Sequence, residues 1–185
     1  MSGNTEPESV GRGMWLVMTG KPEGIACFRG TAKAFFISLT PMLGFSLMAV
    51  ALLWQNGQRR DALEQLLSTP AGILAGPVIS HFLSLRFDRE ARWARYATAL
   101  NWCQWGYLPL FVIVMGLWAG APAIAPMLAL IVVVYAIWMQ LFLARHGLAL
   151  EWPRAIAVVA AVVVGNFVLV LGPNLLGPVL TRVVP

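Results

Sequence analysis

Charged residues are scarce in this chain of 185 residues: Asp, Glu, Lys and Arg together make up 11%, whereas a soluble domain usually carries about a quarter. Hydrophobic residues account for 59%, and the mean hydropathy is +0.74. This composition excludes an ordinary soluble domain and a disordered chain. With only two cysteines, a disulfide-stabilised secreted scaffold is also excluded. The sequence therefore predicts an integral membrane protein.

Long apolar stretches account for most of the remaining sequence. A helix that crosses a bilayer needs about 20 mostly apolar residues, because its backbone polar groups must be satisfied within the segment. Five stretches meet this requirement: residues 34–54, 66–85, 98–119, 122–144 and 155 to about 176. The second contains two prolines and two glycines and has the weakest signal. We therefore expect an all-α, polytopic transmembrane bundle of five helices in residues 34–185, preceded by an arm of residues 1–33.

Two shorter segments have apolar faces but are too short to cross the membrane by themselves. Residues 14–28 begin with a cluster of Met, Trp, Leu and Val and then turn at residues 20–22. Such a segment is typical of one that lies in the lipid headgroup region, and the alternative is a loop packed against the helix ends. Residues 58–67 have one apolar helical face, and we expect this segment to lead directly into the second span.

The basic residues are distributed unequally between the two sides of the predicted bundle. With five spans, ten of the thirteen Lys and Arg residues fall on the side of the N-terminal arm. Because basic residues in short loops stay in the cytoplasm, we expect a cytoplasmic N-terminus and a periplasmic C-terminus. Arginine outnumbers lysine eleven to two, which is typical of a GC-rich bacterial genome and favours a bacterial inner membrane.

Four arginines recur at every third position between the second and third predicted spans: Arg86, Arg89, Arg92 and Arg95. A voltage sensor has a similar spacing, but Asp88 and Glu90 interrupt this run, which excludes a position in the hydrocarbon. We expect a solvated, helical cytoplasmic loop that contacts anionic lipid headgroups or a protein partner. The net charge of +5 therefore indicates membrane topology rather than binding to nucleic acid.

Polar side chains inside the predicted spans are few. The candidate polar site consists of four side chains at a similar depth, toward the cytoplasmic leaflet: His81, Asn101, Gln104 and Gln140. Such residues either hydrogen-bond across helices or line a cavity. A haem or a metal needs converging ligands, for which His81, Cys103 and His146 are the candidates. Because no paired-ligand or catalytic motif is present, we predict no metal site, no cofactor and no enzymatic activity.

Small residues at a spacing of four predict close contacts between helices. Gly72 and Gly76 have this spacing in the second predicted span, and Ala157, Ala161 and Gly165 have it in the fifth. Such positions let helix backbones approach one another closely. We expect them to pack helices within the chain, and the alternative is contact between chains.

The predicted topology resembles that of the Yip1-like membrane proteins. The likeness consists of a cytoplasmic N-terminal arm, five spans, a tight hairpin between spans three and four and little mass on the far side, and it covers roughly residues 34–176. The Asp-Leu-Tyr-Gly-Pro element of the eukaryotic members is absent, and Gly-Pro pairs occur without that context at residues 76–77, 172–173 and 177–178. The resemblance carries over no functional residue. It implies a non-enzymatic protein that organises membranes or binds partners through its cytoplasmic side.

These observations lead to one expected function and two alternatives. We expect a non-enzymatic scaffold, accessory subunit or partner-binding module, embedded in the lipid bilayer with a membrane-protein partner or a second copy of itself. One alternative is a small-solute transporter or channel subunit with its site near His81, Asn101 and Gln104. The other is a haem-binding accessory of an oxidoreductase, with the haem between His81 and His146.

Overall fold

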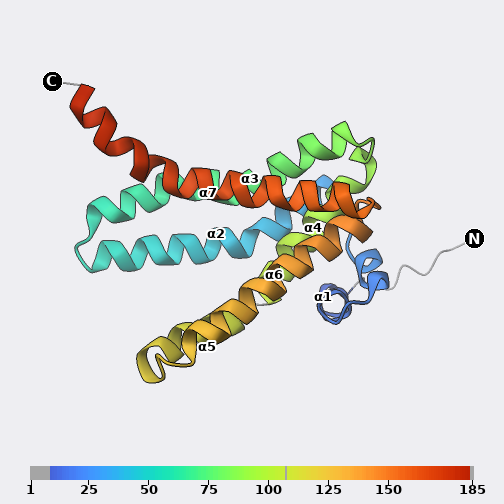
Figure 1. Cartoon of the computed structure of the whole chain (residues 1–185), viewed down its shortest axis with the longest axis horizontal. Coiled ribbons are helices and arrows are strands. Elements are labelled where there is room, and N and C mark those ends of the chain that lie inside the picture. The colour runs from blue at the N-terminus through green and yellow to red at the C-terminus, as the bar shows by residue number, and fades with distance from the viewer. Residues whose placement is uncertain (1–8, 107, 184–185) are drawn as a thin grey trace, which may run out of the picture.

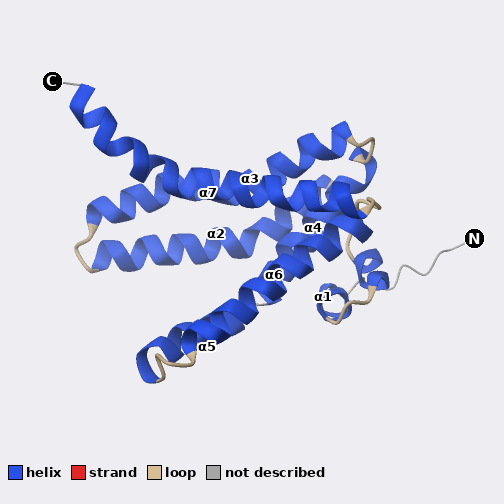
Figure 2. Ribbon diagram, viewed as in Figure 1, coloured by secondary structure: helices blue, strands red, loops and turns tan. Residues whose placement is uncertain are grey.

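A computed structural model describes residues 9–106 and 108–183 of the chain. All of the secondary structure in these residues is helical (Figure 2). The elements are α1 (Val10–Met18), the 3-10 helix η1 (Pro22–Cys27), α2 (Ala32–Gln55), α3 (Arg59–Arg86), α4 (Glu90–Gly106), α5 (Leu108–Gly120), α6 (Ala125–Gly147) and α7 (Trp152–Val183). The predicted all-α class is therefore confirmed.

Four helices in the described residues are long and apolar enough to cross a membrane: α2, α3, α6 and residues 152–169 of α7. They correspond to the first, second, fourth and fifth predicted spans, which supports a multi-pass membrane protein. The third predicted span, residues 98–119, is not among them. It falls on two shorter helices, α4 and α5, which lie on either side of residue 107.

The second predicted span lies in a single helix, although its apolar signal is the weakest of the five. α3 has 28 residues and begins at Arg59, so the segment of residues 58–67 leads directly into the span, as predicted. Pro70 and Pro77 lie inside this helix. Each proline removes one backbone donor, but the helix continues through both positions, because its other backbone groups have no water to bond to in an apolar environment.

A tight turn reverses the chain between α2 and α3. Gly57 has a φ of +78°, a left-handed conformation that glycine adopts without a steric penalty. Its amide donates to the Trp54 carbonyl over 3.1 Å, and the Gln58 amide donates to the Leu53 carbonyl over 3.0 Å. These two bonds satisfy two of the last four carbonyls of α2. The chain therefore turns within residues 56–58, and α3 packs against α2.

The long helices diverge from one end of the molecule (Figure 1). This end, here called the base, contains α1, η1, α4, the start of α2, the ends of α3 and α6 and the start of α7. The opposite, distal end has two arms: α2, α3 and α7 form one, and α5 with the first half of α6 forms the other. Helix α3 contacts α2 and α7, whereas α5 contacts none of α2, α3 and α7 in the described part of the chain. The two arms are therefore joined through the base.

The hydrophobic core is concentrated at the base. Helices α1, α2, α4, α6 and α7 all contribute buried side chains to it, and the largest fully buried apolar ones are Val17, Phe28, Tyr96, Met139, Leu143, Leu148 and Val158. On the distal arms, large apolar side chains such as Leu130 and Phe167 are 63% exposed. Exposed apolar surface of this kind suits contact with lipid tails.

The N-terminal helices are part of this core. Val17 and Phe28 are at most 1% exposed. The Tyr135 hydroxyl donates to the Met18 carbonyl over 2.8 Å and so ties α6 to the end of α1. Residues 14–28 are therefore packed against the helix ends, which was the alternative prediction for this segment. Because Trp15 is 69% exposed, a contact between the outer face of α1 and lipid headgroups stays a prediction.

Close contact between α3 and α7 explains two of the small residues. A Cβ atom added at Gly76 would lie 3.5 Å from Cγ1 of Val162, and one added at Gly165 would collide with Cδ1 of Ile79. Gly76 and Gly165 therefore pack helices within the chain, as predicted. Gly72 differs from them, because a Cβ atom there would meet nothing within 4 Å.

Candidate functional site

Asn101, one of the predicted polar residues, forms a buried link between α4 and α2. Its side-chain amide donates to the Ser38 hydroxyl oxygen over 2.9 Å, and the Ser38 hydroxyl donates to the Phe35 carbonyl over 2.6 Å. Both polar side chains are at most 3% exposed. The sequence analysis missed Ser38, although its helical spacing from Phe35, together with the neighbouring Leu39, places it on the buried face at the start of α2.

His81 packs against an aromatic ring of the neighbouring helix. The ring centroids of His81 and Trp93 lie 4.6 Å apart. The Trp93 indole N–H donates to the hydroxyl oxygen of the buried Ser80 over 3.2 Å, which joins α4 to α3. The Nδ1 atom of His81 is buried and has no hydrogen-bond partner among the described residues. His81 therefore belongs to an aromatic contact between α3 and α4.

The two predicted glutamines do not join these links. Gln104 and Gln140 are half-buried, and within the described residues no hydrogen bond connects either of them to His81 or Asn101. The candidate polar site thus separates into two interhelical links, at Asn101 and at His81, and two glutamines outside them.

The possible haem or metal ligands lie in different surroundings. His146 packs against Phe142 of its own helix, with ring centroids 4.6 Å apart, and α6 does not contact α3, which carries His81. Cys103 is buried. No group of three His, Cys, Asp or Glu side chains in the described residues is arranged to hold a metal ion.

The four arginines of the predicted loop lie at the ends of two helices. Arg86 is the last residue of α3, and Arg92 and Arg95 belong to the first turns of α4. Because only residues 87–89 separate these helices, most of the expected helical loop is part of α3 and α4 themselves. Arg86, Arg92 and Arg95 are exposed. Arg89 is half-buried, and its buried Nε has no hydrogen-bond partner among the described residues.

Basic side chains gather at the base. Of the twelve Lys and Arg residues whose side chains are described, ten lie in elements of the base or in the loops that join them, and Arg59 and Arg60 lie at the distal end. One of the ten, Arg145, lies over the Trp152 ring with its guanidinium carbon 4.4 Å from the ring centroid, a favourable cation–π arrangement. The base is therefore a packed unit with a cationic surface.

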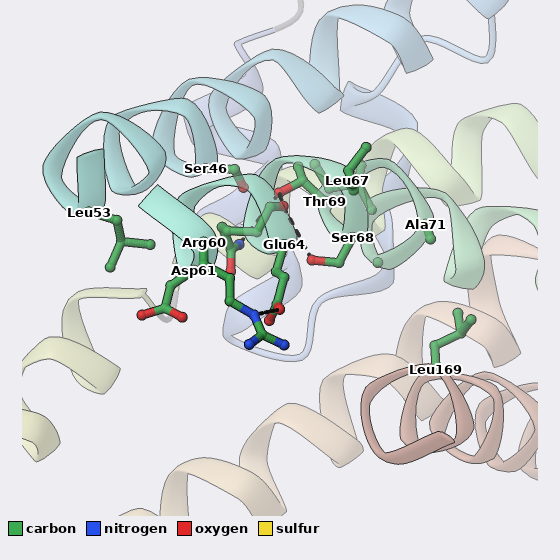
Figure 3. Close-up of a pocket in the computed structure, with 13 residues that line it drawn as sticks. Ser46, Leu53, Arg60, Asp61, Glu64, Leu67, Ser68, Thr69, Ala71 and Leu169 are labelled. Atoms are coloured by element: carbon green, nitrogen blue, oxygen red, sulfur yellow. Dashed lines mark hydrogen bonds and ion pairs between the residues drawn. The ribbon is translucent and has the colours of Figure 1, made fainter. Parts of the chain in front are cut away.

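A pocket that the sequence analysis missed lies at the distal end, between α2, α3 and α7 (Figure 3). Its volume is about 1100 Å³, and most of its lining comes from the first four turns of α3. Its polar lining residues are Ser46, Arg60, Asp61, Glu64, Gln65, Ser68 and Thr69. The sequence does contain a signal for it, because polar residues and Gly72 interrupt the start of the second apolar stretch.

Comparisons of the chain with protein-family models, with curated proteins and with solved structures found no match. The resemblance to the Yip1-like membrane proteins therefore stays a prediction from topology.

Proposed function

We propose that this chain is a non-enzymatic, multi-pass membrane protein that acts as a scaffold, accessory subunit or partner-binding module through its cationic base. The observation that carries the proposal is the contrast between the interior and the surface of the base. Inside, hydrogen bonds between polar side chains join neighbouring helices, as Asn101 bonds to Ser38 and Trp93 bonds to Ser80. On the surface, Arg86 and Arg92 are exposed. Internally satisfied polar groups hold helices together, whereas exposed cations are available to an acidic partner surface or to anionic headgroups.

We further propose that the chain crosses the membrane five times, with the base in the cytoplasm. Helix α3 ends at the base, and α6 returns to the base from the distal end (Figure 1). If α3 and α6 each cross the membrane, α4 and α5 together must cross it as well, because they connect the two. The excess of Lys and Arg at the base supports its cytoplasmic location. A bacterial inner membrane with a periplasmic C-terminus completes this arrangement.

The test is purification of the full-length protein from its native membrane in a mild detergent, with an absorbance spectrum and mass spectrometry of whatever travels with it. We expect a stoichiometric protein partner and no visible chromophore. The variant Arg92→Glu should reduce the recovered partner at least fivefold, because it reverses one exposed charge of the base. The matched variant Arg59→Glu reverses one exposed charge at the distal end and should leave partner recovery unchanged.

A charge reversal near a span can also alter insertion, so topology is measured in the same variants. Single cysteines at Asn56→Cys and Glu151→Cys, in a chain carrying Cys27→Ala and Cys103→Ala, report the distal and base loops to a membrane-impermeant maleimide. We expect intact cells or spheroplasts to label only the distal cysteine. A chain that purifies without a protein partner would contradict the proposal, and a bound chromophore or a bound solute other than a phospholipid would favour a transport or haem function near His81.

A further inference from the structure

We propose that the distal pocket binds one phospholipid whose head group carries a primary ammonium, as in phosphatidylethanolamine. The pocket lies away from the cationic base, so lipid binding in the pocket does not depend on the proposed binding of a partner at the base. Three features support this assignment: the shape of the pocket, the order of its lining residues, and the charged side chains of Arg60, Asp61 and Glu64 (Figure 3). These charged residues lie at the start of α3, which is here called the mouth of the pocket.

The lining changes from charged to apolar along α3. Arg60 and Asp61 lie in the first turn of the helix, Ser68 and Thr69 follow two turns later, and Ile73 is the last lining residue on α3. At 1.5 Å per residue, the path from Arg60 to Ile73 covers about 20 Å, which is more than half the hydrocarbon thickness of about 30 Å. A small polar solute would leave the apolar part unmatched. An amphiphile matches both parts, with its head group at the start of α3 and an acyl chain toward Ile73.

The charges at the mouth favour a head group that carries both signs. The Nε of Arg60 lies 2.9 Å from a carboxylate oxygen of Glu64, whereas Asp61 has no ion-pair partner among the described residues. One negative charge is therefore uncompensated, and it can pair with an ammonium group. The Arg60 side chain is 89% exposed, and its guanidinium has N–H donors besides the Nε that bonds to Glu64, so Arg60 can keep this pair and also bind the phosphate of the same head group. A purely anionic lipid lacks the group that would neutralise Asp61.

Two hydroxyl groups line the pocket about two turns further along α3, and both bond within their own helix. Ser68 and Thr69 both donate to the Gln65 carbonyl, over 3.2 Å and 2.7 Å. The Thr69 hydroxyl oxygen also accepts from the Gln65 side-chain amide over 3.4 Å, so the choice between head groups is made at Asp61 rather than at these hydroxyls. A primary ammonium has three N–H donors, as a lysine side chain does, whereas a quaternary ammonium has none. Because only a primary ammonium can donate an N–H bond to the Asp61 carboxylate, this difference selects phosphatidylethanolamine over phosphatidylcholine.

Gly72 allows the pocket to be filled without disturbing the helix packing. It lines the pocket, and a Cβ atom there would meet nothing within 4 Å. The variant Gly72→Leu therefore places a side chain in the space assigned to the acyl chain. Gly44 in α2 is the matched control, because its Cβ would also meet nothing within 4 Å and it does not line the pocket. Asp61→Asn removes the uncompensated charge at an exposed position, where folding is not at risk.

The experiment is native mass spectrometry of the full-length protein after delipidation and reconstitution with equal amounts of phosphatidylethanolamine, phosphatidylcholine and phosphatidylglycerol of identical acyl chains. We expect one retained phosphatidylethanolamine, favoured at least fivefold over each of the other two. Gly72→Leu should lower its retention at least tenfold, and Gly44→Leu should retain it as the wild type does. Asp61→Asn should abolish the preference over phosphatidylglycerol while some binding persists.

Three results would overturn the assignment. These are equal retention of the three lipids by the wild type, unchanged retention in Gly72→Leu, and an unchanged preference in Asp61→Asn. If Gly72→Leu does not fold, as judged by circular dichroism and size-exclusion chromatography, the Asp61→Asn variant decides whether the assignment holds. Its preference for phosphatidylethanolamine over phosphatidylglycerol must then be lost. Loss of the partner on Arg92→Glu with normal lipid retention would separate this site from the function of the base.

Discussion

The base and the distal end of this molecule are built from the same helices but pack in different ways. At the base, side chains from α1, α2, α4, α6 and α7 interlock, and Leu143 and Met139 are fully buried. At the distal end the two arms separate (Figure 1), and side chains such as Leu130 remain exposed on the same helix that buries Leu143. One helix can therefore be tightly packed at one end and face lipid at the other.

This difference shows where the stability of the fold arises. In a bilayer, apolar side chains gain little by leaving lipid for protein, so helix association depends on close packing and on hydrogen bonds between helices. Both are found at the base, where Asn101 bonds to Ser38 and Tyr135 bonds to the Met18 carbonyl. The distal arms need only remain helical in the membrane, which leaves them free to form a pocket for a ligand.

The largest expected effect comes from comparing one leucine at each end of α6. Leu143→Ala should lower the free energy of unfolding by about 3 kcal/mol, because it leaves a cavity in the packed base. Leu130→Ala should change it by less than about 0.5 kcal/mol, because that side chain is exposed. The measurement is unfolding in mixed detergent micelles, followed by circular dichroism. Equal losses for the two variants would show that the base is no better packed than the arms.

A smaller effect is expected from the buried polar link at the base. In a double-mutant cycle of Asn101→Ala and Ser38→Ala, the coupling free energy should be about 1 kcal/mol, as for other hydrogen bonds between membrane helices. Gln104→Ala is the control on the same helix, because Gln104 has no hydrogen bond to Ser38, and its coupling to Ser38→Ala should be close to zero. A cycle in which Asn101 and Ser38 behave additively would rule out this link as a source of stability.

The smallest effect concerns two turns with the same backbone conformation at opposite ends. Ala149 at the base has a φ of 51°, and Gly57 at the distal end has a φ of +78°. Residues other than glycine lose about 1 kcal/mol in this conformation. Ala149→Gly should therefore raise the free energy of unfolding by about 0.5 to 1 kcal/mol, and Gly57→Ala should lower it by a similar amount. Opposite shifts of the thermal midpoints would confirm this, and shifts of the same sign would contradict it.

Part of the candidate site was predictable from particular residues. Asn101 stands out because an amide in an apolar stretch needs a partner, and Gly76 stands out because of its spacing. The partner Ser38 was harder to find, because a serine can satisfy itself on its own helix, as Ser38 does with the Phe35 carbonyl. The distal pocket was missed because its residues come from three helices, and only contacts distant in sequence bring Leu169 to the same pocket as Ser46.

The sequence by itself determined that the chain is helical and membrane-embedded, because backbone groups in hydrocarbon must bond within apolar stretches of sufficient length. It also determined that basic residues gather on one side, since their positions between spans are fixed by the order of the chain. The tertiary structure alone decided which end of the bundle is packed, that residues 14–28 belong to that core, and that a pocket opens at the other end. These features depend on how side chains from separate helices fit together, and helical periodicity carries no information about that fit.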